Sequence, residues 1–381
     1  MQETLSFLAM KKFNNIEIYP YTELLDNPFG KSFHRGGPLW PDWELQKDIR
    51  HNIGGSVVDQ KPEESAGPKL VFEENLYWCG AITGHFGHQI TDFSSRIANY
   101  KNLEGKLCFA VHPRSNISRF DDCPPFFKEI ISILGFSEKD IYIVSQPIIA
   151  KTLFVCPQKE QLGGIAPESK YLDILDGINQ PIKREKKLGN YYISRAAQKT
   201  GRLAGESYIE SFLGLCGYKV VRPETISLAE QIRIYKNAKK IVFSEGSAVH
   251  SLQLLGRNPV DVTILNRRQG TRIAENLLRH RVETLCYFNM GKLVYGLNKA
   301  GKPAQELGIC VPSKEKLINF FNSQNIPFSQ FNFDLFEMIV LNDIKVWLDN
   351  ERNSQRNNPK SKLMIEKLIM EVLGSKSACI L

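Results

Sequence analysis

The chain has 381 residues, of which 42% are hydrophobic and 24% are charged, as in an ordinary globular protein with room for two domains. Forty-nine Lys and Arg residues against 41 Asp and Glu residues give a formal charge of +8 with His neutral. This excess fits anionic ligands or a loose association with an anionic membrane surface. No basic stripe with interleaved aromatic residues occurs, so nucleic acid is not an expected partner.

The ends of the chain and its cysteines bear on location. Residues 1–6 show no basic region followed by a long apolar stretch, so we expect no signal peptide. No apolar run approaches the ~20 residues of a membrane-spanning helix. The eight cysteines form no C-x-x-C pair, which indicates reduced, buried thiols in a cytoplasmic protein. Cys379 stands third from the end, so the tail is not a prenylation motif.

The first part of the chain predicts an α/β domain over residues 1–180. Residues 1–67 show little periodicity and many loop signals, among them Asn27-Pro28. An α/β series then begins, with strands expected at 69–72, 76–79, 106–111, 141–144 and 152–155. A helix is expected over 124–134, ended by Gly135. Residues 176–187, which are highly charged and contain Pro181, are the expected linker.

Residues 84–96 predict a helix with two different faces. At ~100° per residue, a polar and an apolar stripe fall about a third of a turn apart. The polar stripe holds His85, His88, Asp92 and Arg96. The apolar stripe can pack on a sheet and leave the polar stripe facing a cleft.

Two other interpretations of that polar stripe stay open. Asp92 and Arg96 could form a surface ion pair worth only a few tenths (~0.3) of a kcal/mol. His85, His88 and Asp92 also have a spacing that suits a metal, but zinc usually needs a further ligand, and none is evident. We therefore expect no metal.

Residues 191–265 alternate between strand and helix patterns. Strands are expected at 191–194, 219–221, 240–244 and 260–265. Helices are expected at 204–216, ended by Gly217, and from a capping box of Ser227 and Glu230 to about Ala238. This alternation predicts a parallel sheet covered on both faces, in a second domain over residues 188–330.

Two strand ends of this sheet carry residues that suit anions. Ligands of such sheets bind beyond the carboxyl ends of the strands, where helix N-termini present free amides. Arg195 and Arg202 follow the first strand, and guanidinium groups hold phosphate in a fork. The third strand runs into Ser244-Glu-Gly-Ser247, small residues that allow close approach to backbone amides. An ordinary turn with solvated arginines is the alternative. Neither a dinucleotide fingerprint nor a P-loop occurs.

The remaining residues predict a largely helical C-terminal region over 331–381. Before that region, the end of the second domain is expected to contain a basic helix at 271–281, an aromatic strand region at 286–294 and a helix at 313–323. The C-terminal region itself begins with a helix expected at 332–350. Residues 351–361 form an expected linker, and 362–373 an amphipathic helix. That last helix can pack within the chain, return to the N-terminal domain, pair with another subunit or lie on a membrane.

The second domain resembles glycosyltransferase family 61 (DUF563). The resemblance rests on Tyr192-Ile-Ser-Arg195, Arg202, Glu206, Gly217-Tyr218, Val221-x-Pro223, Ser227-x-x-Glu230-Gln231, Ala238 and Ile241–Ala248, and more weakly on residues 84–96. The family often has Asn-Glu in place of Gly205-Glu206 and His-Gly-Ala-Gly in place of Glu245–Ala248. It includes eukaryotic O-linked N-acetylglucosaminyl- and xylosyltransferases and bacterial proteins with surface-polysaccharide functions.

The resemblance implies the GT-B arrangement, two Rossmann-like domains facing a cleft. It implies a metal-independent, inverting transfer of a sugar from a nucleotide-sugar, first of all a UDP-sugar, to a glycan hydroxyl in surface-polysaccharide synthesis. The nucleotide-sugar would be a substrate, and no cofactor is expected. A transferase of CMP-linked acid sugars and a non-catalytic glycan-binding scaffold are the alternatives. The expected location is the cytoplasm or the inner face of the membrane.

The resemblance also implies roles for single residues. Donor contacts fall to Arg195, Arg202, Glu206, Glu230, Gln231, Ser244, Glu245, Gly246 and Ser247. His85 and Arg96 belong to the acceptor side, and Asp92 and His88 to the catalytic step. We place Asp92 before His88 as the base, because a short carboxylate is firmly held and His88 can orient it. An ion pair with Arg96 would weaken Asp92 by lowering its pKa.

Overall fold

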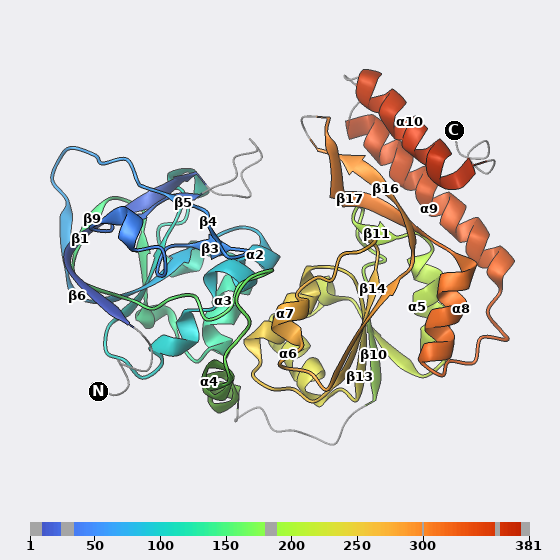
Figure 1. Cartoon of the computed structure of the whole chain (residues 1–381), viewed down its shortest axis with the longest axis horizontal. Coiled ribbons are helices and arrows are strands. Elements are labelled where there is room, and N and C mark those ends of the chain that lie inside the picture. Colours follow the sequence, from blue (N-terminus) through green and yellow to red (C-terminus); the bar gives the residue numbers. More distant parts are fainter. Residues whose placement is uncertain (1–9, 24–33, 180–188, 299–300, 355–358, 375–381) are drawn as a thin grey trace.

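Two separate sheets lie side by side along the long axis of the molecule (Figure 1). The figure shows a computed structural model, which describes residues 10–23, 34–179, 189–298, 301–354 and 359–374. Helices and strands alternate in both halves, so the predicted α/β class is confirmed. The predicted linker over 176–187 lies mostly outside the described residues, and its first four residues end a helix, α4 (Ser169–Asn179).

The first sheet has seven strands, in the order β5-β2-β1-β9-β6-β7-β8. Four neighbours, β9, β6, β7 and β8, run parallel, whereas β1 is antiparallel to both β2 and β9. The sheet is thus mixed, and the expected strands 69–72 and 76–79 are one strand, β6. The bounds are β1 Lys11–Glu23, β2 His34–Pro38, β5 Asp59–Gln60, β6 Leu70–Ala81, β7 Lys106–Ala110, β8 Ile141–Val144 and β9 Ile148–Val155.

The second sheet is fully parallel, in the order β12-β10-β13-β14-β15. Its strands are β10 Asn190–Ile193, β12 Tyr218–Val221, β13 Lys240–Ser244, β14 Asp261–Asn266 and β15 Thr284–Asn289. The chain moves outward from β10 to β12 and then crosses back to β13. The carboxyl ends of β10 and β13 therefore meet at the switch point of the sheet, where open α/β sheets bind ligands.

Helices cover both faces of the second sheet. One face carries α6 (Leu228–Asn237) and the 3-10 helix η7 (Ser247–Leu254), and the other carries α5 (Glu206–Leu215) and α8 (Lys314–Ser323). Ser227 caps α6 by accepting a hydrogen bond from the Glu230 amide at 3.1 Å, as predicted. The Glu230 carboxylate binds Arg233 instead of the Ser227 amide. The expected helix 271–281 shortens to α7 (Glu275–Leu278).

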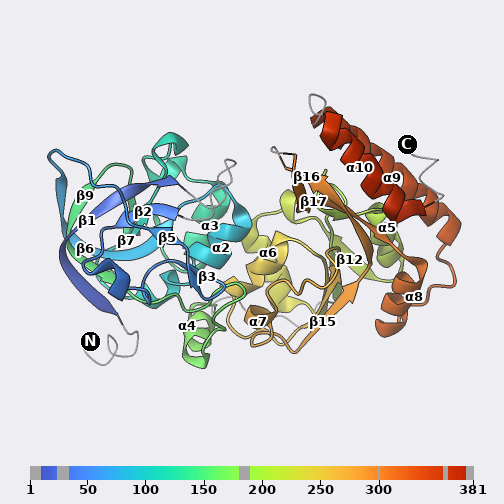
Figure 2. The ribbon, with the colours of Figure 1, turned by 45° about the horizontal axis from the view of Figure 1, so that its top comes forward.

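The C-terminal helices pack on the second half of the chain. A small sheet of β11 (Arg202–Leu203), β17 (Pro303–Pro312) and β16 (Gly291–Leu297) adjoins α9 (Phe333–Ser354) and α10 (Pro359–Leu373). Trp347 of α9 and Ile365 of α10 are buried in one core with this sheet. Both helices lie at the end of the molecule away from the first sheet, so α10 does not return to it (Figure 2). Among the described helices, none is long and apolar enough to cross a membrane.

A continuous core joins the two halves. Helix α2 (Phe86–Phe93) of the first half packs on η7, and α3 (Pro125–Ile133) packs on α6. The Glu129 carboxylate accepts a hydrogen bond from the Ala229 amide at 3.1 Å. Arg281 Nη1 lies 2.8 Å from Glu160 Oε2, and these side chains are only 1% and 3% exposed. The halves are therefore fixed against each other, with α2 and α3 facing the carboxyl edge of the second sheet.

The Glu160–Arg281 pair gives a test of this interface. In Glu160→Ala, Arg281 keeps its charge in the core without a partner, so the free energy of unfolding should fall by ~3 kcal/mol. Asp173→Ala is the matched control, since that side chain is 62% exposed in its pair with Arg257 and should cost under ~1 kcal/mol. Urea unfolding measures both, and equal losses would show that the buried pair does not hold the halves together.

Candidate functional site

The cleft between the halves contains two adjoining cavities, of about 420 and 710 Å³. Arg195 and Ser247 line both, so the cavities meet at the switch point of the second sheet. The first half contributes α2 and α3 to the smaller cavity, and α2 with Leu162 and Gly163 to the larger one. The site is thus assembled from both halves of the chain.

Three neighbouring strands of the second sheet deliver polar residues to the larger cavity. Arg195 follows β10, Gly246 and Ser247 follow β13, and Arg267 and Arg268 follow β14. Because the strands are parallel, their carboxyl ends lie at one edge. Arg272 also lines this cavity, and Glu306 is the single acidic residue among its described lining residues. Arg268 and Arg272 are paired with Glu245 and Glu275, so the positive charge of the cavity rests mainly on Arg195 and Arg267.

Arg195 and Arg267 are half or more buried and form no ion pair within the described part of the chain. Arg195 Nε donates to the Gly201 carbonyl at 3.0 Å, and Arg267 Nη1 donates to the Gln305 carbonyl at 3.1 Å. Burial lowers the pKa of Arg195, and burial with the nearby charges of Arg268 and Arg195 lowers the pKa of Arg267 to about 10. Both remain cationic at neutral pH, so an anion would relieve two crowded positive charges.

Glu245 shapes this cavity from behind. Its carboxylate is fully buried and accepts hydrogen bonds from the amides of Arg267 and Arg268 at 2.8 and 2.9 Å. It also binds the Arg268 guanidinium at 2.5 Å. Glu245 lies in the loop that the sequence indicated, but it lines neither cavity. Its carboxylate holds Arg267 and Arg268 in place and does not face a ligand.

The loop after β13 brings backbone against Arg195. Gly246 is extended, with φ of 179°, so its conformation does not require glycine. Its surroundings do, because a Cβ here would lie 2.7 Å from Arg195 Cδ and Cζ. Ser247 lies in the cavity wall. Ser244 is buried beneath the loop, where its hydroxyl helps to lower the pKa of the buried Glu206 carboxyl.

Besides Ser244 and Glu245, three more predicted donor-binding residues lie outside both cavities, namely Arg202, Glu206 and Glu230. Glu206 is fully buried and accepts hydrogen bonds from the Arg195 amide at 2.7 Å and the Tyr192 hydroxyl at 3.0 Å. Burial raises the Glu206 pKa, and the hydrogen bond from the Arg195 amide opposes that rise. Arg202 pairs with Asp343 of α9 at 3.1 Å, and Glu230 pairs with Arg233 on the surface. Glu206 thus positions Arg195, while Arg202 anchors a helix.

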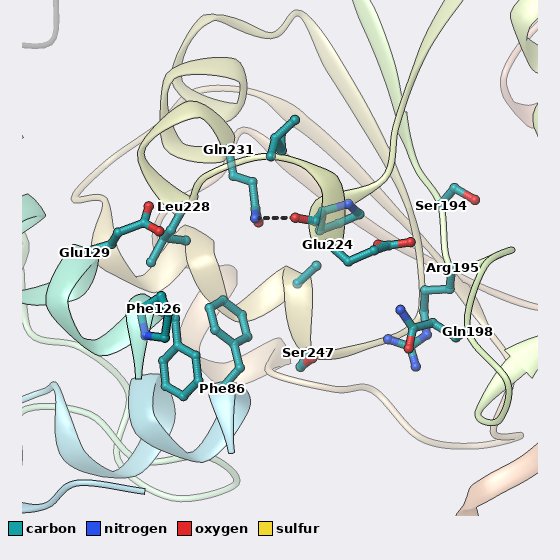
Figure 3. Close-up of a pocket in the computed structure, with 14 residues that line it drawn as sticks. Phe86, Phe126, Glu129, Ser194, Arg195, Gln198, Glu224, Leu228, Gln231 and Ser247 are labelled. Carbon is teal, nitrogen blue, oxygen red and sulfur yellow. Dashed lines mark hydrogen bonds between the residues drawn. The ribbon is translucent and has the colours of Figure 1, made fainter. Parts of the chain in front are cut away.

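The smaller cavity suits a flat heterocycle. Phe86 and Phe126 stand at its wall with their rings perpendicular and their centroids 5.6 Å apart (Figure 3). Gln231 lines this cavity and is 5% exposed. Its Nε2 donates to the Pro223 carbonyl at 3.0 Å, which leaves a buried Oε1 with no partner in the described structure. A ligand N–H group would satisfy that oxygen.

Helix α2 presents two histidines to the larger cavity. His88 Nδ1 lies 2.8 Å from Asp92 Oδ2, and the side chains are 40% and 5% exposed. Asp92 Oδ1 accepts a hydrogen bond from the Thr91 hydroxyl at 2.9 Å. His85 caps the helix by accepting a hydrogen bond from the His88 amide at 3.2 Å. His85 and His88 line the cavity, whereas Asp92 lies behind His88.

Arg96 is not on the acceptor side. Helix α2 ends at Phe93, so the helical spacing that aligned Arg96 with Asp92 does not extend to it. Arg96 is 1% exposed and donates to the carbonyls of Cys156, Ile49 and Arg50 at 2.9 to 3.1 Å. It anchors loops of the first half, and its pairing with Asp92, which the sequence left open, does not occur among the described ion pairs.

Sequence reasoning missed several lining residues, namely Phe86, Phe126, His250, Arg267 and Arg268. Arg267 and Arg268 directly follow a predicted strand of the same sheet, so the rule that selected Arg195 also applied to them. The other three come from helices whose orientation depends on how the halves meet.

Comparison with known proteins gives one family. Residues 86–276, half of the chain, match the family Glycosyltransferase 61. The matched segment starts in α2 and extends through α7, so it contains most residues of both cavities. No match was found among proteins of curated function.

Gly246 gives a test of the anion site. Gly246→Ala should displace the Arg195 guanidinium and weaken binding of pyrophosphate by at least ~tenfold, with little change in melting temperature. Gly84→Ala is the control, because a Cβ there meets no heavy atom within 4 Å. Isothermal titration measures both variants. Unchanged pyrophosphate affinity in Gly246→Ala would show that Arg195 does not hold the anion.

Proposed function

Because the chain belongs to glycosyltransferase family 61, we propose that it transfers a sugar from a nucleotide-sugar to a glycan hydroxyl with inversion at the anomeric carbon. The domains would then form the GT-B arrangement implied by the resemblance, with donor contacts mainly from residues 188–330 and acceptor contacts from residues 1–180. The cleft between the two sheets supports this assignment. Surface-polysaccharide synthesis on the cytoplasmic side would be the setting.

The observation that carries the proposal is the pair of buried cations, Arg195 and Arg267, neither of which forms a direct ion pair among the described residues. A diphosphate placed at the switch point would meet both guanidinium groups and the amides that follow Gly246. When the bond from the anomeric carbon to the diphosphate breaks, negative charge develops on the leaving oxygen. Cations already fixed in a partly dry site stabilise that charge without reorganisation.

The smaller cavity would hold the nucleobase. From the diphosphate at Arg195, the nucleoside would extend past Gln198 and Glu224 towards Phe86 and Gln231 (Figure 3). Uracil carries an N–H at ring position 3, which can donate to the unpartnered Gln231 Oε1. Cytosine has an acceptor at that position, and a CMP-sugar has one phosphate for two arginines. A UDP-sugar therefore fits better than the CMP-linked alternative.

His88 would be the base, with Asp92 orienting it. The Asp92 carboxylate accepts from His88 Nδ1, which fixes the proton there and leaves the lone pair on Nε2. That nitrogen would take the proton of the acceptor hydroxyl while its oxygen attacks the anomeric carbon opposite the diphosphate. This order reverses the ranking from the sequence, because Asp92 is buried with both oxygens bonded.

The two roles can be separated by substitution. His88→Ala should lower kcat by ~10² to 10⁴, with UDP affinity within ~threefold of the wild type. Asp92→Asn should also lower kcat and shift the acidic limb of the pH profile, since it changes the environment of the base. Exposed His280 supplies the control, His280→Ala. Near-normal kcat in His88→Ala alongside a large loss in Asp92→Asn would restore Asp92 as the base.

The arginines also predict the response to chelation. With Arg195 and Arg267 stabilising the leaving diphosphate, transfer should continue within ~twofold in saturating EDTA. Arg267→Gln should reduce kcat by ~10² or more whether EDTA is present or not. A rate that collapses in EDTA and returns with Mg²⁺ or Mn²⁺ would contradict this assignment, because a metal would then supply the charge.

A further inference from the structure

His250 is a buried histidine of the larger cavity that the mechanism above does not use. It lies on η7, three residues after Ser247, and is 4% exposed. A 3-10 helix has three residues per turn, so residues 247 and 250 point to the same side, ~6 Å apart along the axis. Both line the larger cavity. His250 therefore lies one turn beyond the loop that adjoins the anion site.

The hydrogen bonding of His250 fixes which ring nitrogen accepts. Its Nδ1 lies 3.0 Å from Gln253 Oε1, which can only accept, so the ring proton is on Nδ1. Burial lowers the His250 pKa to about 4, with the Gln253 hydrogen bond opposing, so the ring is neutral at pH 7. Nε2 then carries a lone pair and cannot donate.

The other two histidines of this cavity have tautomers set by different partners. His85 Nδ1 accepts from the His88 amide, which places the proton of a neutral His85 on Nε2. His88 Nδ1 donates to Asp92. Because α2 packs on η7, His250 and these two histidines line one cavity, with His250 one turn beyond Ser247. Arg195, Arg267 and the proposed base His88 line the same cavity, so a sugar carried by a diphosphate at these arginines would occupy the cavity that His250 also lines.

We propose that His250 Nε2 accepts a hydrogen bond from a hydroxyl group of the donor sugar, which makes His250 a determinant of donor-sugar specificity. The inference rests on the proposed function. Ser247 and Arg195 lie where the diphosphate ends, and ~6 Å spans a pyranose ring attached to it. A sugar lacking that hydroxyl, or bearing it with the opposite configuration, would leave the buried Nε2 without a partner and bind more weakly.

The test compares binding of the nucleotide with binding of the nucleotide-sugar. UDP, UDP-glucose, UDP-galactose, UDP-xylose and UDP-N-acetylglucosamine are titrated into the wild type, His250→Phe and His250→Gln. For the tightest UDP-sugar, the ratio of the Kd for UDP to the Kd for the sugar nucleotide should fall by ~tenfold in His250→Phe. It should recover in His250→Gln, whose amide oxygen can accept. The Kd for UDP should stay within ~threefold in both variants.

Monodeoxy analogues of that UDP-sugar identify the hydroxyl. One analogue should bind the wild type ~tenfold more weakly than the parent UDP-sugar does. The same analogue and the parent should bind His250→Phe equally, since the substitution and the missing hydroxyl remove the same hydrogen bond. Equal weakening of UDP and UDP-sugar in the variants, or an unchanged ratio, would overturn the assignment of His250. If the His250 variants give one of these contrary results while UDP binds the wild type with an affinity that depends on Arg195, only the inference about His250 is wrong. If the wild type binds no nucleotide, the proposed function falls with it.

Discussion

The candidate site depends on two arginines, Arg195 and Arg267, that are buried at the carboxyl edge of the second sheet without a carboxylate of the described chain paired directly with either of them. Arg195 and Arg267 each donate to backbone carbonyls, and neither guanidinium forms a direct ion pair among the described residues. Nearby carboxylates exist, but Glu206 and Glu245 are turned towards backbone amides and hold the loops in place. Carboxylates paired directly with these guanidinium groups would have filled the anion site with protein.

The fixed interface of the two halves supplies the second requirement. A short helix of the first half, α2, contributes Phe86 to the smaller cavity and Gly87 and His88 to the larger one. The position of α2 is set by its packing on η7, the 3-10 helix that follows the loop after β13. Gly87 has no side chain where it meets Ser247, and a Cβ there would lie 3.3 Å from the Ser247 Cβ. The packing of α2 on η7 thus sets how the cavity walls from the two halves meet.

Much of this arrangement could be predicted from the sequence, for local reasons. Periodicity predicted four of the five strands of the second sheet and helices α5 and α6 to within about two residues, because each is bounded by a cap or a turn, such as Ser227 and Gly217. The single strand region expected at 286–294 is instead divided between β15 and β16, which belong to different sheets. The positions of Arg195, Gly246 and Ser247 followed from strand ends, whereas Gln231 came from the family resemblance. In the first half, β1 was missed because its first residues are largely exposed and polar, and its pairing partner β9 lies more than 100 residues away.

The errors share a physical cause. Arg202 and Arg96 look like ligand-binding cations in the sequence, yet each is taken by a distant partner, Asp343 of α9 and loop carbonyls of the first half. Contacts between residues far apart in the sequence decide whether an arginine is paired with another protein group, and the local sequence pattern does not show such contacts.

The same reasoning explains the order of His88 and Asp92. A helix places residues four apart on one face but does not say which lies nearer the cavity. Here Asp92 sits at the buried end of the stripe and His88 at the open end. A carboxylate held by Thr91 and His88 is well suited to fix a ring and poorly placed to meet a substrate. Depth within the stripe, set by how α2 docks on η7, therefore favours His88 as the proposed base, whereas from the sequence we place Asp92 first.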